Sequence, residues 1–277
     1  QIELRGDPEA VRNIGLAVES LGYDYLLTYD HVLGATHDRE PKLTGPYTER
    51  DPFHDPLMMF AHLAALTHRI ELVTGILILP QRQTALVARQ AADLALLSGG
   101  RLRLGIGLGW NYVEYEALGQ SFKTRGRRCE DQIALLRKLW TEPLVSVDGE
   151  FDHVERAALN PRPERLIPIW FGGSSEAAYR RAARIGDGFI LNGDDQRVTE
   201  AWARIEQHLK EAGRLAAPFG KERVIGRQDR TPREVAAHIQ WCREFGCTHV
   251  AIDTMGKGFD TAQAHIEFLG EVRQRLT

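Results

Sequence analysis

Apolar positions along the chain follow two spacings, which indicate helices and strands in alternation. From Pro8 to Leu21 they recur every three or four residues, which predicts an amphipathic helix ended by Gly22. The short apolar run YDYLLTYD (23–30) comes next and is typical of a buried strand. The same order returns along the rest of the sequence, so we expect a parallel sheet covered by helices.

Seven strands and eight helices can be assigned from this alternation. Because the strand–helix units follow one another with no break between domains, they favour a (β/α)8 TIM barrel, a single domain over residues 1–277, rather than an open doubly wound sheet. The pattern begins on a helix and the chain begins at Gln1, not at a methionine, so we expect the first barrel strand to be missing from the numbered chain. Asp148-Gly149 predicts a β-hairpin turn. The barrel strands are predicted at 23–30, 69–80, 101–109, 167–173, 187–193, 222–226 and 248–254.

Composition narrows the class of protein further. The chain is 43% hydrophobic with a formal net charge of −3, which gives no electrostatic reason to expect nucleic acid or an anionic membrane as a partner. No apolar run approaches the roughly 20 residues of a membrane-spanning helix, and no signal peptide is evident. The three cysteines do not suggest a disulfide framework, so we predict a cytoplasmic protein. The histidine spacing does not indicate a metal site.

A barrel of this type carries its active site at the carboxyl ends of the strands, so the residues that follow each strand are the candidates for chemistry. His31 is the candidate for proton exchange near neutral pH, and a hydrogen-bonded structural histidine is the alternative. The full set is Asp30 and His31; Thr74, Gly75 and Ile76; Gly107, Leu108, Gly109 and Trp110; Gly172, Gly173, Ser174 and Ser175; Asn192 and Gly193; Gly226 and Arg227; and Asp253, Thr254 and Met255.

Two of these strand ends are rich in glycine. The first has glycines at 105, 107 and 109, a GxGxG spacing that lacks the acidic partner of a Rossmann dinucleotide site. Its glycines either let the strand pass through a crowded barrel interior or leave room for a flat ring. The second, FGGSS (171–175), opens a helix and is the better candidate for binding a phosphate. An ordinary corner with Ser174 or Ser175 as the N-cap is the alternative.

Several segments resemble the luciferase-like monooxygenase superfamily, in that superfamily's order. The resemblance extends over nearly the whole chain and points to the branch that depends on the deazaflavin coenzyme F420. It implies a (β/α)8 barrel of the bacterial-luciferase type. The segments are SLGYDYLLTYDHV (20–32), the stretch from LAALTHRIELVTG to GLGWNYVEYEALG (63–119), and IPIWFGGSSEAAYRRAARIGDGFIL (167–191).

The resemblance implies a role for each candidate residue. His31 would be the catalytic proton donor or acceptor beside the reactive ring of the cofactor. Gly75 and Ile76 would be joined by a cis peptide bond that forms a bulge behind the ring. Further cofactor contacts are expected from Asp30, Thr74, Gly107 and Gly109 and, around the phosphate, from Gly172, Gly173, Ser174 and Ser175; substrate contacts are expected from Trp110, Tyr112, Glu114, Asn192 and Thr254.

The implied activity is hydride transfer between coenzyme F420 and a small organic substrate. An FMN-dependent monooxygenase that uses O2 and a separate flavin reductase is the alternative, since the motifs for the two cofactors overlap. The excess of arginine over lysine is common in the actinobacterial genomes in which F420 is made. A non-catalytic flavin-binding barrel is a second alternative. A lyase or isomerase without a redox cofactor would need a Schiff-base lysine or paired carboxylates, which the strand ends lack.

The resemblance also suggests a homodimer and a reductase that supplies reduced cofactor. We do not expect a sugar phosphate as substrate, because Leu33 and Gly34 stand where some relatives carry an aromatic residue, and Arg227 alone is basic at a strand end. The long polar segment Leu33–Asp55 either folds over the site as a lid or packs on the barrel or on a partner subunit.

Overall fold

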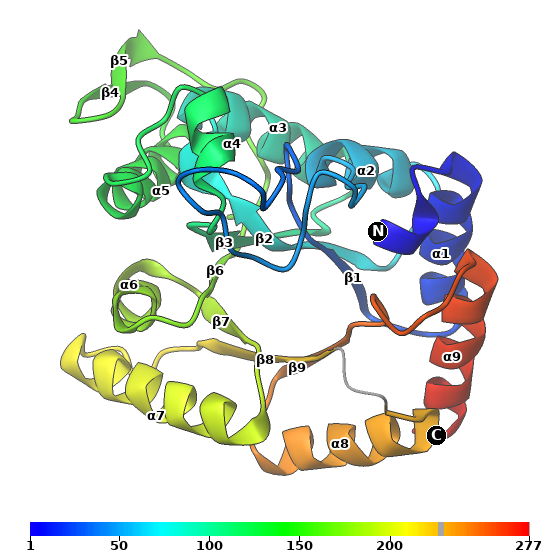
Figure 1. The fold of residues 1–277 in the computed structure, drawn as a ribbon. Helices are drawn as coiled ribbons and strands as arrows, with labels where there is room; N and C mark the ends of the chain where they lie inside the picture. Colours follow the sequence, from blue (N-terminus) through cyan, green and yellow to red (C-terminus); the bar gives the residue numbers. More distant parts are fainter. Residues whose placement is uncertain (227–229, 277) are drawn as a thin grey trace.

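The computed structural model describes residues 1–226 and 230–276, and its seven parallel strands form a nearly closed barrel (Figure 1). Each strand pairs in parallel with the next, whereas no pairing joins the last strand to the first within the described residues. The predicted TIM-barrel architecture is confirmed. In order of pairing the strands are β1 (Tyr25–Thr28), β2 (Glu71–Ile78), β3 (Leu102–Gly107), β6 (Ile169–Gly172), β7 (Gly188–Leu191), β8 (Gly220–Ile225) and β9 (His249–Ile252).

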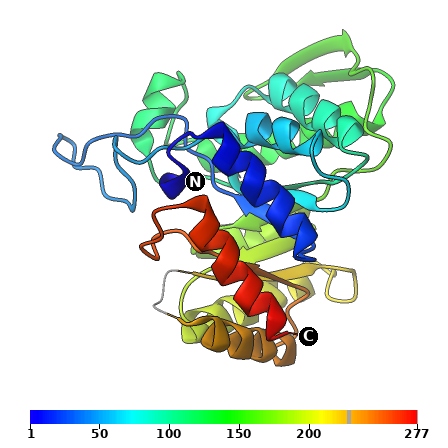
Figure 2. The same ribbon diagram turned by 90° about the vertical axis from the view of Figure 1, so that its right-hand side faces the viewer.

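Helices form the outer layer of the barrel, and most of them begin at a side chain that caps the first turn. Thr231 and Glu234 form a reciprocal capping box at the start of α8. The first and last helices, α1 and α9, lie side by side (Figures 1 and 2). The helices are α1 (Pro8–Ser20), α2 (Pro56–Ala64), α3 (Thr84–Leu97), α5 (Arg125–Thr141), α6 (Glu176–Ile185), α7 (Asp195–Glu211), α8 (Pro232–Glu244) and α9 (Ala262–Gln274).

Shorter elements lie between these units. The short helix α4 (Tyr112–Ala117) follows β3 and was not among the eight helices assigned from the sequence. The predicted hairpin is present and consists of β4 (Val145–Asp148) and β5 (His153–Ala157). Two 3-10 turns are η1 (Ile2–Leu4) and η2 (Leu79–Gln81). The helix α7 begins at Asp195, because the Asp194 side chain caps it by accepting a hydrogen bond from the Arg197 amide at 2.9 Å.

A buried ion cluster lies in the barrel interior, near the amino ends of the strands. Arg103 on β3 is 2% exposed, and its guanidinium donates to Glu222 on β8 at 2.6 Å and to Glu71 on β2 at 2.9 Å. The guanidinium also lies over the Trp170 ring, 4.1 Å from its centre. The cluster fills the interior at the amino ends of the strands, and an open cavity lies at their carboxyl ends.

The strand β2 is irregular near its carboxyl end. The pairing register between β2 and β3 shifts between Thr74 and Leu77, and the Gly75–Ile76 peptide bond is cis. The implied bulge and cis bond are therefore present.

The edge strands β1 and β9 border a cleft of about 190 Å³. Apolar residues from both strands and from α1 line it, with Gln1 at one end. Among the described residues, no helix has the length and apolar character needed to cross a membrane.

Candidate active site

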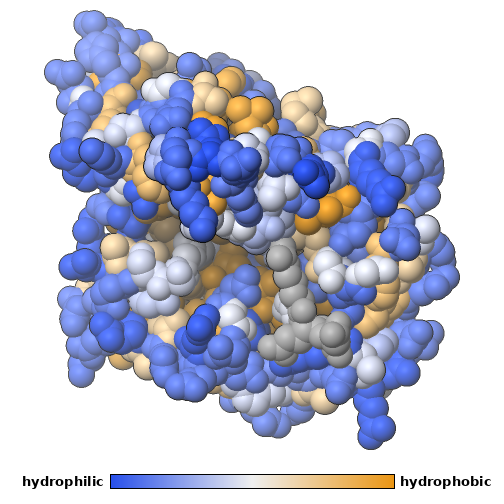
Figure 3. Space-filling model, in the orientation of Figure 1, coloured by the Kyte–Doolittle hydropathy of each residue, from blue (hydrophilic) through white to orange (hydrophobic). Residues whose placement is uncertain are grey.

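A cavity of about 510 Å³ opens at the carboxyl ends of the strands; we call it the barrel-mouth cavity. Figure 3 shows a hollow on this face, with an apolar floor and a polar rim. Its position agrees with the general location of active sites in TIM barrels. The lining residues are Tyr29, Asp30, His31, Pro46, Tyr47, Gly75, Ile76, Ile78, Gly109, Trp110, Asn192, Gly193, Arg223, Ile225, Gly226, Arg230 and Asp253.

His31 follows β1 and is held by a buried carboxylate. Its Nδ1 lies 3.2 Å from Oε1 of Glu114 on α4, and the Glu114 side chain is 1% exposed. The same Oε1 accepts hydrogen bonds from the amides of Val32 at 2.9 Å and Leu33 at 3.2 Å, and Oε2 accepts one from Gln81 at 3.0 Å. Glu114 was predicted to contact substrate; in the structure its carboxylate contacts His31 and is not part of the cavity lining.

The charge of Glu114 fixes the orientation of the imidazole. Burial by itself would raise the pKa of the Glu114 carboxyl, but hydrogen bonds from His31 and Gln81 outweigh it and lower that pKa below its ordinary value. An ionised carboxylate only accepts hydrogen bonds, so the proton of a neutral His31 resides on Nδ1. The Nε2 atom then remains for exchange with a ligand in the cavity.

Aromatic side chains surround the other faces of His31. The rings of Tyr47, Phe53 and Trp110 have their centres 5.1, 4.8 and 5.6 Å from that of the imidazole. Tyr47 and Phe53 belong to the segment Leu33–Asp55, which therefore covers His31. Gly45 of this segment packs so closely on Trp110 that a Cβ atom at this position would lie 2.2 Å from the indole.

Asp30 anchors this arrangement from below. Its side chain is fully buried, and its two oxygens accept hydrogen bonds from the Ile78 amide at 2.9 Å and from Arg82 at 2.8 Å. Arg82 also donates to Asp55 at 2.8 Å, where α2 begins. Burial raises the pKa of Asp30, and Arg82 opposes that shift. Asp30 thus ties β1, β2 and the end of the covering segment together.

The glycines of β3 have a packing role. A Cβ atom on Gly107 would lie 1.6 Å from Cδ1 of Ile76, and one on Gly105 would lie 2.1 Å from the carbonyl oxygen of Thr74. Gly172 on β6 similarly faces Ile76, at 2.8 Å. The glycines therefore make room for the bulged strand, and Ile76, not Gly107, borders the cavity.

Other predicted residues lie outside this cavity lining. The Thr74 hydroxyl donates to the Gly105 carbonyl at 2.8 Å. The Tyr112 hydroxyl donates to the carbonyl of Pro41 in the covering segment. The loop Gly172–Ser175 lies at the end of β6, where Gly173, Ser174 and Ser175 are exposed and Ser175 caps α6. Arg227 falls outside the described residues.

One wall of the cavity was missed by reasoning from sequence. It carries Arg223 of β8, Arg230, and a hydrogen-bonded pair in which the Tyr29 hydroxyl donates to Asp253 at 2.9 Å. The sequence placed Asp253 at a strand end but assigned it no role. Arg223 and Arg230 lie on either side, in sequence, of Arg227, which was the one basic residue that the sequence analysis placed at a strand end.

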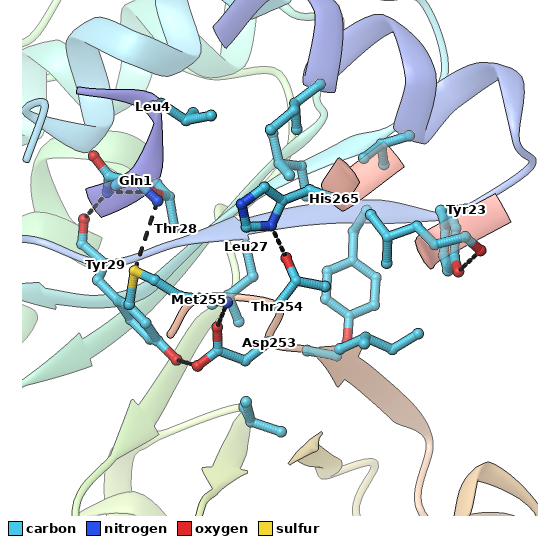
Figure 4. Close-up of a pocket in the computed structure, with 18 of the residues that line it drawn as sticks. Gln1, Leu4, Tyr23, Leu27, Thr28, Tyr29, Asp253, Thr254, Met255 and His265 are labelled. Atoms are coloured by element: carbon cyan, nitrogen blue, oxygen red, sulfur yellow. Dashed lines mark hydrogen bonds between the residues drawn. The ribbon is translucent and has the colours of Figure 1, made fainter. Parts of the chain in front are cut away.

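The hydrogen-bonded pair of this wall also borders the β1–β9 cleft, whose lining is drawn in Figure 4. Tyr29 and Asp253 line both the cleft and the cavity. Thr254, predicted to contact substrate, faces the cleft and hydrogen-bonds through its hydroxyl to Nδ1 of His265 at 2.8 Å. The described residues hold no cluster of three potential metal ligands.

Comparison with known proteins identifies relatives by sequence. An uncharacterized protein of Mycobacterium tuberculosis is 33% identical over 208 residues, which are 73% of this chain and 72% of that protein. An F420-dependent glucose-6-phosphate dehydrogenase of Gordonia bronchialis is 32% identical, over 66% of this chain and 53% of its own length. An FMNH2-dependent dimethylsulfone monooxygenase of Pseudomonas fluorescens is 31% identical, over 66% of this chain and 48% of its own length.

A solved structure shows the same fold. An F420-dependent secondary alcohol dehydrogenase, in complex with an F420–acetone adduct, superposes with a TM-score of 0.79 and 16% identity, over 99% of this chain and 96% of that chain. The family model described as luciferase-like monooxygenase matches residues 2–245. The chain therefore belongs to the luciferase-like monooxygenase family.

Proposed function

We propose that the protein is an oxidoreductase that transfers a hydride between coenzyme F420 and a small organic substrate, with His31 as the proton donor or acceptor. The observation that carries this proposal is the His31–Glu114 pair at the wall of the barrel-mouth cavity. Two similar proteins that are described as F420-dependent, a glucose-6-phosphate dehydrogenase and a secondary alcohol dehydrogenase, support the choice of cofactor.

The residues of the cavity fit a flat ring. Its volume of about 510 Å³ lies within the usual size of small-molecule sites. Ile76 projects from the bulge of β2, with Gly107 and Gly172 too small to displace it. We infer that Gly75, Ile76 and Gly109 border the ring, and that the exposed loop Gly172–Ser175 receives the cofactor phosphate. A bound deazaflavin supplies the hydride chemistry.

The protein itself orients the reactants, limits water and moves one proton. Glu114 keeps the Nδ1 proton of His31 in place, so exchange with the substrate takes place at Nε2. Tyr47 and Phe53 cover the imidazole and reduce its contact with water.

An FMN-dependent monooxygenase is the second candidate function, because the relatives include an FMNH2-dependent enzyme. Such an enzyme would need reduced flavin from a reductase partner.

The first experiment is a titration of the protein with oxidised F420 and, separately, with FMN, followed by tryptophan fluorescence, since Trp110 lines the cavity. Tight binding of F420 with weak binding of FMN is expected. The reverse order would favour the monooxygenase, and binding of neither would contradict both candidates. His31→Gln should then lower F420-dependent turnover about 10²–10⁴-fold without changing F420 affinity. His153→Gln, on an exposed hairpin, is the control.

A further inference from the structure

Two guanidinium groups on one wall of the barrel-mouth cavity have buried nitrogens without a hydrogen-bond partner. Arg223 has only 3% of its side chain exposed. It donates to the carbonyl oxygens of Val224 at 2.5 Å and Gly193 at 2.6 Å, while its Nε has no partner among the described residues. Arg230 is half-buried, and its Nη1 likewise has no partner within the described part of the chain.

Such unpaired donors are costly, because a buried polar group that gives up water without a replacement loses free energy. Charged donors lose more than neutral ones. Both groups line the same cavity, together with Asn192 and Gly193 at the end of β7. Because the two guanidinium groups border one space, a ligand there with several acceptor oxygens would meet two cationic donors.

Acidic groups face both arginines. Asp195 lies 3.4 Å from Nη2 of Arg223 and 3.1 Å from His238, whose pKa is lowered by burial and by the two arginines, so the Asp195 charge stays opposite Arg223. Glu234 interacts electrostatically with Arg230. Asp253 accepts hydrogen bonds from the Tyr29 hydroxyl and from the Met255 amide, both at 2.9 Å. On the far side of Arg230, the Lys257 ammonium donates to its backbone carbonyl at 3.0 Å and adds positive charge.

We propose that Arg230 and Arg223 form a subsite for an oxyanion, a phosphate or carboxylate group, opposite the His31 wall of the cavity. Guanidinium groups bind such anions through short, charge-assisted hydrogen bonds. The loops that follow late strands of a TIM barrel are also a frequent location for anion sites. If the proposed function is correct, this subsite holds an anionic group of the substrate while its reacting atom lies toward His31.

The test uses inorganic phosphate and acetate as probes, titrated at constant ionic strength with sodium chloride as the balance. The melting temperature is followed for the protein alone and with F420 bound. Arg230→Met is the main variant, and Arg223→Lys is the second, because full removal of the buried Arg223 side chain can prevent folding. Arg184→Met is the matched control, since this exposed arginine pairs with Glu130 on the barrel exterior.

The expected result is saturable stabilisation by phosphate or acetate that Arg184→Met retains and Arg230→Met weakens roughly tenfold to a hundredfold in apparent affinity. Equal binding with and without F420 assigns the anion to the substrate, whereas competition by F420 assigns the subsite to the cofactor's own phosphate. Absence of saturable stabilisation, or equal affinity in Arg230→Met and Arg184→Met, overturns the subsite. If neither F420 nor FMN binds but phosphate binding depends on Arg230, the proposed function fails and the subsite stands.

Discussion

The side chain of Ile76 occupies the space that a Cβ atom on Gly107 would need, with Cδ1 only 1.6 Å from that position. Gly107→Ala should therefore push Ile76 from the bulge into the cavity. We expect a loss of about 1–3 kcal/mol in the free energy of unfolding, from overpacking, and a weaker affinity for the cofactor ring. Urea denaturation and cofactor titration measure the two effects.

Two further variants test whether a clash with Ile76 causes the loss of stability in Gly107→Ala. Ile76→Val removes the Cδ1 atom, so adding it to Gly107→Ala should restore part of the lost stability in a double-mutant cycle. Gly270→Ala on α9 is the control, because its nearest neighbour would be 3.6 Å away and alanine favours helices. Additive losses in the double variant would show that the clash lies elsewhere.

Glu114→Gln should impair the orientation of His31 while keeping the shape of the site. Because the folded protein lowers the pKa of Glu114, the ionised carboxylate stabilises the fold. That contribution, about 1–3 kcal/mol relative to the variant, is complete above the ordinary pKa of 4.5 and is lost as the pH falls through the lowered folded-state pKa. Denaturation of both proteins between neutral and acid pH measures it. A stability difference that does not change with pH would contradict the assignment; Glu200→Gln, exposed on α7, is the control.

Removal of Arg82 should be among the most destabilising changes near the site. Arg82→Met would leave the fully buried Asp30 carboxylate without its cation, and the expected loss is about 3–5 kcal/mol in the free energy of unfolding. The difference in the free energy of unfolding between Arg82→Met and the unchanged protein should become smaller at acid pH, since protonation of Asp30 removes the buried charge. Arg184→Met should change stability by less than about 0.5 kcal/mol. A loss of similar size in both variants would argue that the ion pair contributes little.

The aromatic cover over His31 can be tested by chemical access. Phe53→Ala should increase the rate at which diethyl pyrocarbonate modifies His31 several-fold, because the ring centres now lie 4.8 Å apart. Mass spectrometry reports the modification, with the exposed His153 as an internal reference. Phe151→Ala, in the turn of the β4–β5 hairpin, should leave His31 as protected as before. Equal rates in all three proteins would show that the segment Leu33–Asp55 does not shield the imidazole.

The barrel was predictable because most of its strands are nearly continuous apolar runs and a helix follows each of them along the chain. The position of His31 was predictable for the same reason, since it directly follows a strand. Its partner was not: Glu114 lies 83 positions away, and only the packing of α4 against the end of β1 brings the two together. Spacing along a chain carries no signal for such a contact.

The arginine wall was missed for a different reason. Arg223 lies inside the strand sequence KERVI, where charged residues weaken the apolar pattern that marks a strand. In the structure one oxygen of Glu222 accepts a hydrogen bond from Arg103 inside the barrel, while Arg223 donates to the carbonyl of Gly193 at the rim. A charged residue in a strand is informative only once its partners are known, and those partners belong to other strands.

Tyr29 and Asp253 form a partition with the cavity on one side and the β1–β9 cleft on the other. A side chain that filled the cleft would contact the same hydrogen-bonded pair that borders the cavity. Occupancy of the cleft and ligand binding in the cavity should therefore be thermodynamically linked, and each should change the affinity of the other by the same factor. Occupation of the cleft and ligand binding in the cavity would then be two coupled steps of one equilibrium.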